Sequence, residues 1–248
     1  MLTASMATIR VGESRATEAT SAVARPADAD AAANVFASVK CVAFDVDSTV
    51  STEEGIDVLA AALGKGDEVA AWTNKAMGGD VTFQEAIKAR LDILKPTKGA
   101  IDNLVKTSPI PITPEMPELI AALQARGTAV VFVSGGLLPL VRPVADALNV
   151  DDVFAIDLYF DDLGGFLDFD RRAPTARTNG KADVLHALRS IHGSVAMVGD
   201  GVTDLEAACE ADVMVGFGAN VVREPVKSGC DWWVTSAREL IDALSKSE

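Results

Sequence analysis

The sequence is short of the side chains that bind soft metals and form disulfides. It holds three cysteines, Cys41, Cys209 and Cys230, and two histidines in 248 residues. No two of the cysteines are closely spaced, which excludes a zinc-binding pattern and a disulfide framework. Cys41 falls in an apolar run, so we interpret it as a small buried residue. We therefore expect a protein of a reducing compartment.

Basic side chains and long apolar runs are also scarce. The chain has 22 basic and 36 acidic side chains, a net charge of −14. Such a surface repels nucleic acid and anionic lipid, so we expect neither as a partner. No stretch approaches the roughly 20 unbroken apolar residues that span a bilayer, and we expect a soluble protein. Any phosphate site here needs local positive charge from Lys, Arg, a metal or helix N-termini.

Residues 1–37 differ in composition from the rest of the chain, because they are rich in alanine and show little hydrophobic periodicity. Residues 27–40 are compatible with a short helix, and the remainder predicts a disordered tail. Two interpretations of this tail remain open, an ordinary tail or an organellar transit peptide. The arginines suit a transit peptide, whereas Glu13 and Glu18 do not. We favour the transit peptide and hence a plastid or another organelle; an ordinary tail would leave the protein in the cytoplasm.

From residue 40 onward, strand and helix patterns alternate. "VKCVAF" is a continuous apolar run, typical of a parallel strand covered on both faces. "VFAIDLYFDDLGGFLDFD" predicts two strands around a turn. The alternation predicts an α/β fold, a doubly wound and mostly parallel Rossmann-like sheet with right-handed crossovers. The other expected strands are 128–134, 194–200 and 212–218, and the helices are 117–127, 138–149, 181–193, 204–211 and 236–247.

A block of helices interrupts this pattern directly after the first strand. Thr82 and Glu85 form a capping-box signature at the start of one of them. The block contains no convincing strand pattern. We therefore divide the chain into a core, residues 38–54 and 109–248, and an inserted helical cap, residues 55–108. The helices expected in the cap are 55–64, 67–77, 82–94 and 97–108.

Polar side chains follow the predicted strands at the points where these end. In an open α/β sheet, ligands bind outside the carboxyl ends of the strands, so these side chains are expected at one edge. A lysine opens the helix before the third of these strands. The set comprises Asp45, Asp47, Ser134, Gly135, Lys181, Asp200 and Asp204.

Four clustered carboxylates repel one another unless a cation joins them. Oxygen ligands without His or Cys select a hard ion, and we expect Mg²⁺. The ion, Lys181 and the Ser134 hydroxyl supply what a phosphate group needs. One carboxylate can attack phosphorus as a nucleophile, and a second can move protons.

The ordered motifs "DVDST", "SGG", a lysine and "GDGVTD" resemble those of the haloacid dehalogenase superfamily of phosphatases. More narrowly, "FDVDSTVSTEEGIDVLA", "AMGGDVTFQEAIKARL", "VFVSGG" and "MVGDGVTDLEA" closely resemble the phosphoserine phosphatase family. The resemblance covers about residues 40–245 and includes the helical insert. It implies Mg²⁺-dependent hydrolysis of O-phosphoserine through an aspartyl-phosphate, the last step of serine biosynthesis. The resemblance is also compatible with a homodimer.

The resemblance implies a role for each matching core position. Asp45 would be the nucleophile, and Asp47 the general acid and base, with its backbone carbonyl also reaching the metal. Asp200 would complete the Mg²⁺ ligands, supported by Asp204. The phosphoryl group would be held by Ser134, Gly135 and Lys181.

At the entrance of the insert and within it, the resemblance implies residues that select the substrate. Glu54 would face the serine ammonium, and Arg90 would clamp the serine carboxylate, since a zwitterion needs one anion and one planar cationic fork. Met77 would form an apolar wall over the substrate. From pattern alone, Arg90 would be a surface residue of an amphipathic helix and Glu54 a helix N-terminal acid.

Two alternatives differ in class from this interpretation. A non-enzymatic phosphoacceptor module, like a response-regulator receiver, also carries an aspartate at a strand end. It lacks the acid/base aspartate two residues on and the inserted cap, so Asp47 and residues 55–108 speak against it. The second alternative is a phosphatase of the same superfamily that acts on another small phosphate ester, which Glu54 and Arg90 disfavour.

Overall fold

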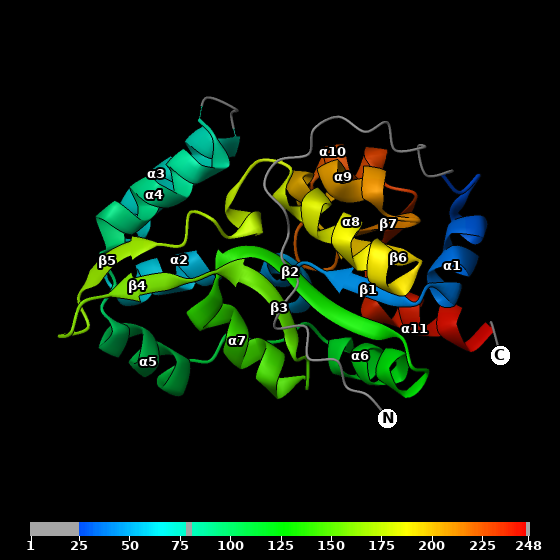
Figure 1. The fold of residues 1–248 in the computed structure, drawn as a ribbon, viewed down its shortest axis with the longest axis horizontal. Helices are drawn as coiled ribbons and strands as arrows, with labels where there is room; N and C mark the ends of the chain where they lie inside the picture. The colour runs from blue at the N-terminus through cyan, green and yellow to red at the C-terminus, as the bar shows by residue number, and fades with distance from the viewer. Residues whose placement is uncertain (1–24, 78–80, 247–248) are drawn as a thin grey trace.

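A central sheet of six parallel strands organises the chain (Figure 1). The computed structural model describes residues 25–77 and 81–246, with the side chains of 73–77 left aside. The strand order is β3-β2-β1-β6-β7-β8, which confirms the predicted doubly wound α/β sheet. The strands are β1 (Cys41–Phe44), β2 (Ala129–Leu137), β3 (Asp152–Ile156), β6 (Val195–Gly199), β7 (Val213–Phe217) and β8 (Trp232–Val234).

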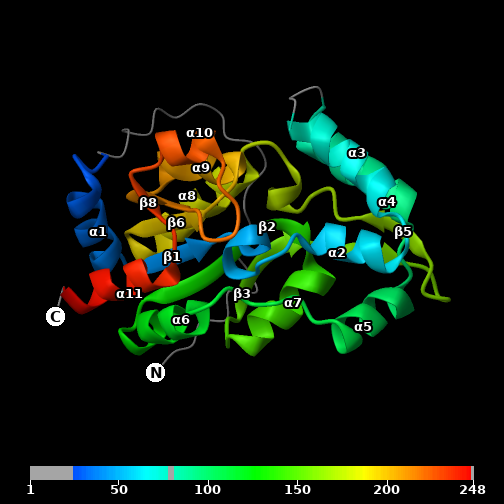
Figure 2. The ribbon, with the colours of Figure 1, turned by 180° about the vertical axis from the view of Figure 1, so that it is seen from behind.

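Helices cover both faces of this sheet, as Figures 1 and 2 show from opposite sides. One face packs against α1 (Ala29–Ser38), α6 (Met116–Ala125), α7 (Leu138–Ala147) and α11 (Ala237–Lys246). The other packs against α8 (Gly180–His192), α9 (Val202–Ala207) and α10 (Glu224–Gly229). Burial on both faces explains why β1 is an unbroken apolar run.

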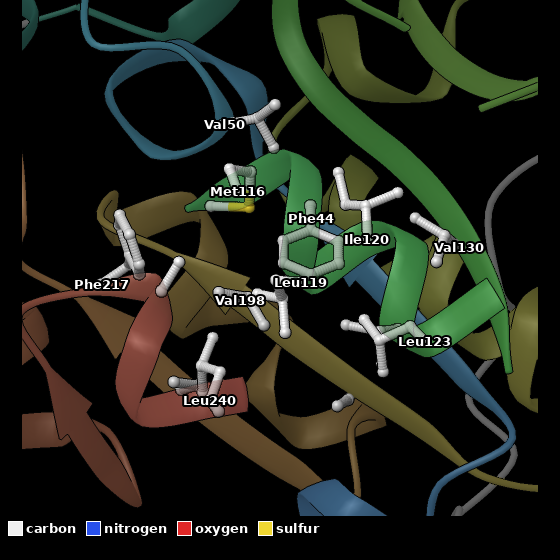
Figure 3. Close-up of a cluster of buried hydrophobic side chains, with 14 of the residues drawn as sticks. Phe44, Val50, Met116, Leu119, Ile120, Leu123, Val130, Val198, Phe217 and Leu240 are labelled. Carbon is white, nitrogen blue, oxygen red and sulfur yellow. The ribbon is translucent and has the colours of Figure 1, made fainter. Parts of the chain in front are cut away.

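Strand β1 divides its side chains between the two cores. Val42 and Phe44 belong to the cluster on the α6 side, whereas Cys41 and Ala43 belong to the cluster on the α8 side. Figure 3 shows the ring of Phe44 among apolar side chains of α6. The full burial of Cys41, predicted from the sequence, raises the pKa of its thiol to about 12. A strand packed on both faces holds the residue that follows it rigidly.

The described part of the insert, residues 55–108, is mainly helical, as predicted. It forms α2 (Gly55–Ala62), α3 (Gly66–Met77), α4 (Phe83–Leu94) and α5 (Lys98–Thr107). The capping box at the start of α4 is present, with Glu85 N–H donating to Thr82 Oγ1 at 3.2 Å. Apolar side chains of these helices form a third core cluster together with residues of the core such as Leu140, Ile156 and Phe169.

The segment 152–169 differs from the expected two strands around a turn. It forms three strands, because the chain leaves the main sheet at Asp157. Strand β3 stays in that sheet, whereas β4 (Leu158–Phe160) pairs antiparallel with β5 (Phe166–Phe169) in a separate hairpin. The hairpin lies beside α5 (Figure 1), where Lys98 N–H donates to the Gly164 carbonyl at 2.9 Å.

Helix α1 includes residues that the sequence-based boundary assigned to the tail. Asp28 accepts a hydrogen bond from Ala31 N–H and thereby caps the helix. Ala32 and Phe36 are buried in the core cluster on the α6 side, and the Phe36 ring meets Trp232 edge-on at 6.0 Å. The short helix expected at 27–40 is therefore a packed part of the fold.

No helix among the described residues is both long enough and apolar enough to cross a membrane.

Candidate active site

Asp45 stands directly after β1, at the carboxyl edge of the sheet. Its backbone N–H donates to the Val198 carbonyl of the neighbouring strand at 2.9 Å. Its Oδ1 accepts from Val46 N–H at 2.7 Å, which fixes the carboxylate relative to the backbone. The chain then turns through Ser48, whose φ of +57° lies in the left-handed region.

Lys181 joins two aspartates beneath this edge. Its Nζ lies 2.9 Å from Asp45 Oδ2 and 2.7 Å from Asp204 Oδ1, and all three side chains are buried. Burial acts to lower the pKa of Lys181, but the carboxylates of Asp204 and Asp45 outweigh it and raise that pKa above its usual value. Lys181 is therefore a permanent cation beside Asp45.

The start of α8, which carries Lys181, approaches the preceding backbone very closely. A Cβ atom at Gly180 would lie 1.7 Å from the Pro174 carbonyl oxygen. Glycine at this position therefore lets Lys181 reach the site.

Asp200 and Asp204 follow β6 and complete an acidic cluster with Asp45. Oxygen atoms of these three buried carboxylates lie within 4.8 Å of one another. Burial and the charge of Asp45 raise the pKa of Asp200, and the same causes raise that of Asp204. Mutual repulsion of this kind is relieved by a cation, and an all-oxygen donor set suits a hard ion such as Mg²⁺.

Asp47 contacts the start of α2 and Ser134 rather than this acidic cluster. Its Oδ1 accepts from Gly55 N–H at 2.6 Å, and Ser134 Oγ donates to its Oδ2 at 3.4 Å. Burial, followed by the charges of Glu54 and Asp45, raises the pKa of Asp47 to about 7. A carboxyl group with this pKa can give or take a proton near neutral pH.

The "SGG" motif lies within β2 rather than after it, because the strand continues to Leu137. Ser134 is fully buried, and its Oγ accepts from Gly136 N–H at 2.8 Å. A Cβ at Gly136 would lie 2.3 Å from Asp47 Oδ2, so this position needs glycine. Gly135 and Lys181 line a shallow pocket together with Phe83 of α4.

Glu54 directly precedes α2, the first helix of the insert, and Arg90 lies on α4 within it. Glu54 Oε1 accepts from Ser48 Oγ at 2.9 Å, and burial raises the pKa of Glu54. Arg90, on α4, is half-buried, and burial lowers its pKa against the charges of Asp57, Glu54 and Asp47. Both residues are thus electrostatically coupled to the acids at the sheet edge. The third predicted cap residue, Met77, has a side chain outside the described residues.

Sequence reasoning missed Arg223, in the segment after β7. Its Nε donates to Asp200 Oδ2 at 2.9 Å, and its Nη2 to Glu54 Oε1 at 3.2 Å. Thr49 Oγ1 donates to the other oxygen of Asp200 at 2.9 Å. Its position after β7 is the sequence signal that could have identified Arg223. Polar residues that follow the end of a parallel strand lie at the same sheet edge as the motifs.

Residues 39–212 match the haloacid dehalogenase-like hydrolase family. The chain belongs to this family and is an enzyme, as its motifs predicted. The match covers β1, the insert and the strands that carry the acidic cluster.

Named relatives narrow the similarity to one kind of phosphatase. A phosphoserine phosphatase of Drosophila melanogaster is 40% identical over 235 residues, covering 93% of this chain and 87% of the relative. A chloroplastic phosphoserine phosphatase of Arabidopsis thaliana is 39% identical over 217 residues, covering 85% and 74%. A solved phospho-aspartyl intermediate analogue of a phosphoserine phosphatase aligns with a TM-score of 0.73 at 28% identity, covering 82% of this chain and 98% of that one. The resemblance inferred from the motifs is confirmed.

Proposed function

We propose that the enzyme hydrolyses O-phosphoserine to serine and phosphate through a phosphorylated Asp45, with Mg²⁺ bound. One observation supports phosphoserine as the substrate over the other phosphate esters that members of the family could hydrolyse. Glu54 and Arg90, an anion and a planar cation, are both coupled to the charged groups around Asp47. An amino-acid substrate needs such a pair, because it carries an ammonium and a carboxylate besides its phosphate.

The first step transfers the phosphoryl group to the enzyme. A carboxylate oxygen of Asp45 forms a bond to phosphorus while the bond from phosphorus to the serine oxygen breaks. Lys181 and Ser134 hold the phosphoryl oxygens, and the Gly135 N–H donates to them. The proton of the Asp47 carboxyl group moves to the departing serine oxygen, so serine leaves as a neutral alcohol.

The second step returns Asp45 to its starting state. Asp47, now a carboxylate, takes a proton from a water molecule whose oxygen attacks phosphorus. The bond from Asp45 to phosphorus breaks, phosphate is released, and Asp47 is protonated again. The raised pKa of Asp47, about 7, supports both roles because the acid and base forms are each populated near neutral pH.

Asp45 and Asp200 would hold the Mg²⁺ ion together with the backbone carbonyl of Asp47, and Asp204 would support the site. The fit rests on the three buried aspartates whose oxygens lie within 4.8 Å of one another. The bound ion would neutralise charge on the phosphoryl oxygens.

Residues 55–108 would act as a cap that selects the substrate. Glu54 would receive the serine ammonium, Arg90 would bind the carboxylate, and Met77 would form an apolar wall. Arg223 would keep Glu54 in place through their ion pair.

A phosphate-release assay over a panel of phosphorylated metabolites tests the proposal. We expect phosphoserine among the best substrates, and we expect activity to disappear with a chelator and return with Mg²⁺. Preference for a sugar phosphate or another phosphate ester over phosphoserine would contradict the substrate choice. Single-turnover phosphorylation without continuing phosphate release would instead indicate a phosphoacceptor module.

We also propose that residues upstream of α1 direct the enzyme to a plastid or another organelle, where it completes serine biosynthesis. The chloroplastic relative of Arabidopsis thaliana supports this location. Fusion of residues 1–28 to a fluorescent reporter should concentrate the reporter in the organelle. A diffuse cytosolic signal would contradict it.

A further inference from the structure

The loop after Asp47 is held by a side chain from a distant part of the chain. Asn220 Nδ2 lies 3.1 Å from the Ser48 carbonyl oxygen and 3.3 Å from the Ser51 carbonyl oxygen. The same amide nitrogen donates to Thr113 Oγ1 at 2.7 Å. Asn220 follows β7, about 170 residues along the chain from the loop that it holds.

Thr113 supplies the two intervening hydrogen bonds. Its hydroxyl donates to the Thr49 carbonyl at 2.8 Å, and its N–H donates to the Val50 carbonyl at 2.9 Å. The four consecutive carbonyl oxygens of residues 48–51 therefore all accept hydrogen bonds from Asn220 or Thr113. This complete set of bonds fixes the orientation of every peptide plane in the loop.

The loop needs such support because its first turn is unfavourable. Ser48 has a φ of +57°, in the left-handed region that L-residues with a side chain disfavour. That turn directs Asp47 toward Gly55 N–H and Ser48 Oγ toward Glu54. A loop that relaxed at Ser48 would displace both acidic groups from their partners.

We propose that Asn220 is a positioning residue for the phosphoryl transfer. It acts through the loop backbone, keeping Asp47 aligned with the serine oxygen and Ser48 in contact with Glu54. The inference rests on the proposed function. Arg223 lies three residues further on, so a single segment after β7 supports the loop, Glu54 and Asp200.

The Asn220→Asp variant tests this role because it keeps the shape and replaces donors by acceptors. A carboxylate facing carbonyl oxygens cannot donate, so the loop loses two anchors. We expect kcat on phosphoserine to fall by about 10- to 100-fold, as small misplacements of catalytic groups do, with KM changed less than about threefold. Activity relative to wild type should partly recover at lower pH, where a protonated carboxyl group donates once more. Asn103→Asp, on the exposed side of α5, is the matched control and should behave as wild type.

Hydrogen–deuterium exchange of residues 46–55 provides a readout independent of catalysis. We expect faster exchange there in Asn220→Asp than in Asn103→Asp at equal thermal stability. Unchanged kcat, or unchanged exchange in this segment, would overturn the proposal. If Asn220→Asp fails to fold, Thr113→Val removes the hydroxyl donor from the same network and is judged by the same two measurements. A wild-type enzyme inactive on every phosphate ester would refute the proposed function, and exchange alone would then decide whether Asn220 holds the loop.

Discussion

Arg223 and Glu54 form an ion pair, with Nη2 3.2 Å from Oε1, at the boundary between the sheet edge and the insert. The same guanidinium donates through Nε to Asp200 at 2.9 Å. The Arg223 side chain therefore connects Asp200, a proposed metal ligand, with Glu54, the proposed binding residue for the substrate ammonium. Ser48 and Arg223 both bind Oε1, so within the described residues these contacts leave the second oxygen of Glu54 open to a ligand.

Replacing Arg223 by glutamine should impair both substrate binding and turnover. The change leaves Asp200 and Glu54 without their cation, and hydrogen bonds to charged groups contribute about 1.5–3 kcal/mol each. We expect kcat/KM for phosphoserine to fall by about 10-fold or more, measured by phosphate release. Arg172→Gln, whose side chain is 91% exposed, is the control and should have no effect. Equal activity of the two variants would show that the ion pair has no role.

Replacing Asp45 by asparagine should abolish turnover and leave the fold intact. An amide cannot form the acyl-phosphate, so neither phosphate release nor an acid-stable phosphoenzyme should be detected. Lys181 keeps its bond to Asp204 at 2.7 Å, so the buried cation stays paired. Thermal unfolding checks the fold, and Asp92→Asn on the exposed face of α4 is the control. Turnover near the wild-type level in Asp45→Asn would show that another residue is the nucleophile.

The parts of the fold that the sequence predicted are those decided by local pattern. The strand β1 was visible because burial on both faces demands an unbroken apolar run. The capping box of α4 was visible because its bonds join residues three apart. The strand β8 was missed because only three residues, Trp232–Val234, pair with β7, too short a run for a periodicity. The break at Asp157 was missed because β3 and β4 are nearly continuous and only their partners differ.

The same distinction applies to the site. Asp45, Asp47 and Asp200 were found because each follows an apolar strand within a recognisable motif. Arg223 and Asn220 were missed because their partners lie about 170 residues away, and only their position after β7, rather than a motif, marks them. Their contacts exist only once β1 and β7 share a sheet edge. A single sequence therefore predicts the acidic residues at the sheet edge better than the residues that hold them in place.

Replacing Arg90 by alanine should weaken phosphoserine binding more than turnover. The proposed contact is to the substrate carboxylate, which takes no part in bond breaking, so its loss removes binding shared by the ground and transition states. We expect KM to rise by about 10-fold or more with a smaller change in kcat. Arg90→Lys keeps the charge without the planar fork, and its KM should lie between those of wild type and Arg90→Ala. Lys88→Ala, on the same helix and exposed, is the control. An unchanged KM would remove the clamp role.

Replacing Gly180 by alanine should destabilise the enzyme because the added methyl group meets backbone. The new Cβ would lie 1.7 Å from the Pro174 carbonyl oxygen, so the start of α8 must shift. Overpacking of this kind costs about 1–3 kcal/mol, and each kcal/mol lowers the Tm of a chain of this size by about 2–4 °C. The shift would also move Lys181, the next residue, away from Asp45, so kcat should fall with the Tm. Gly99→Ala is the matched control, since a Cβ there meets no atom within 4 Å and alanine favours the helix α5. The calorimetric Tm of the control should equal or exceed that of wild type, and a Gly180→Ala variant as stable as Gly99→Ala would refute the close approach.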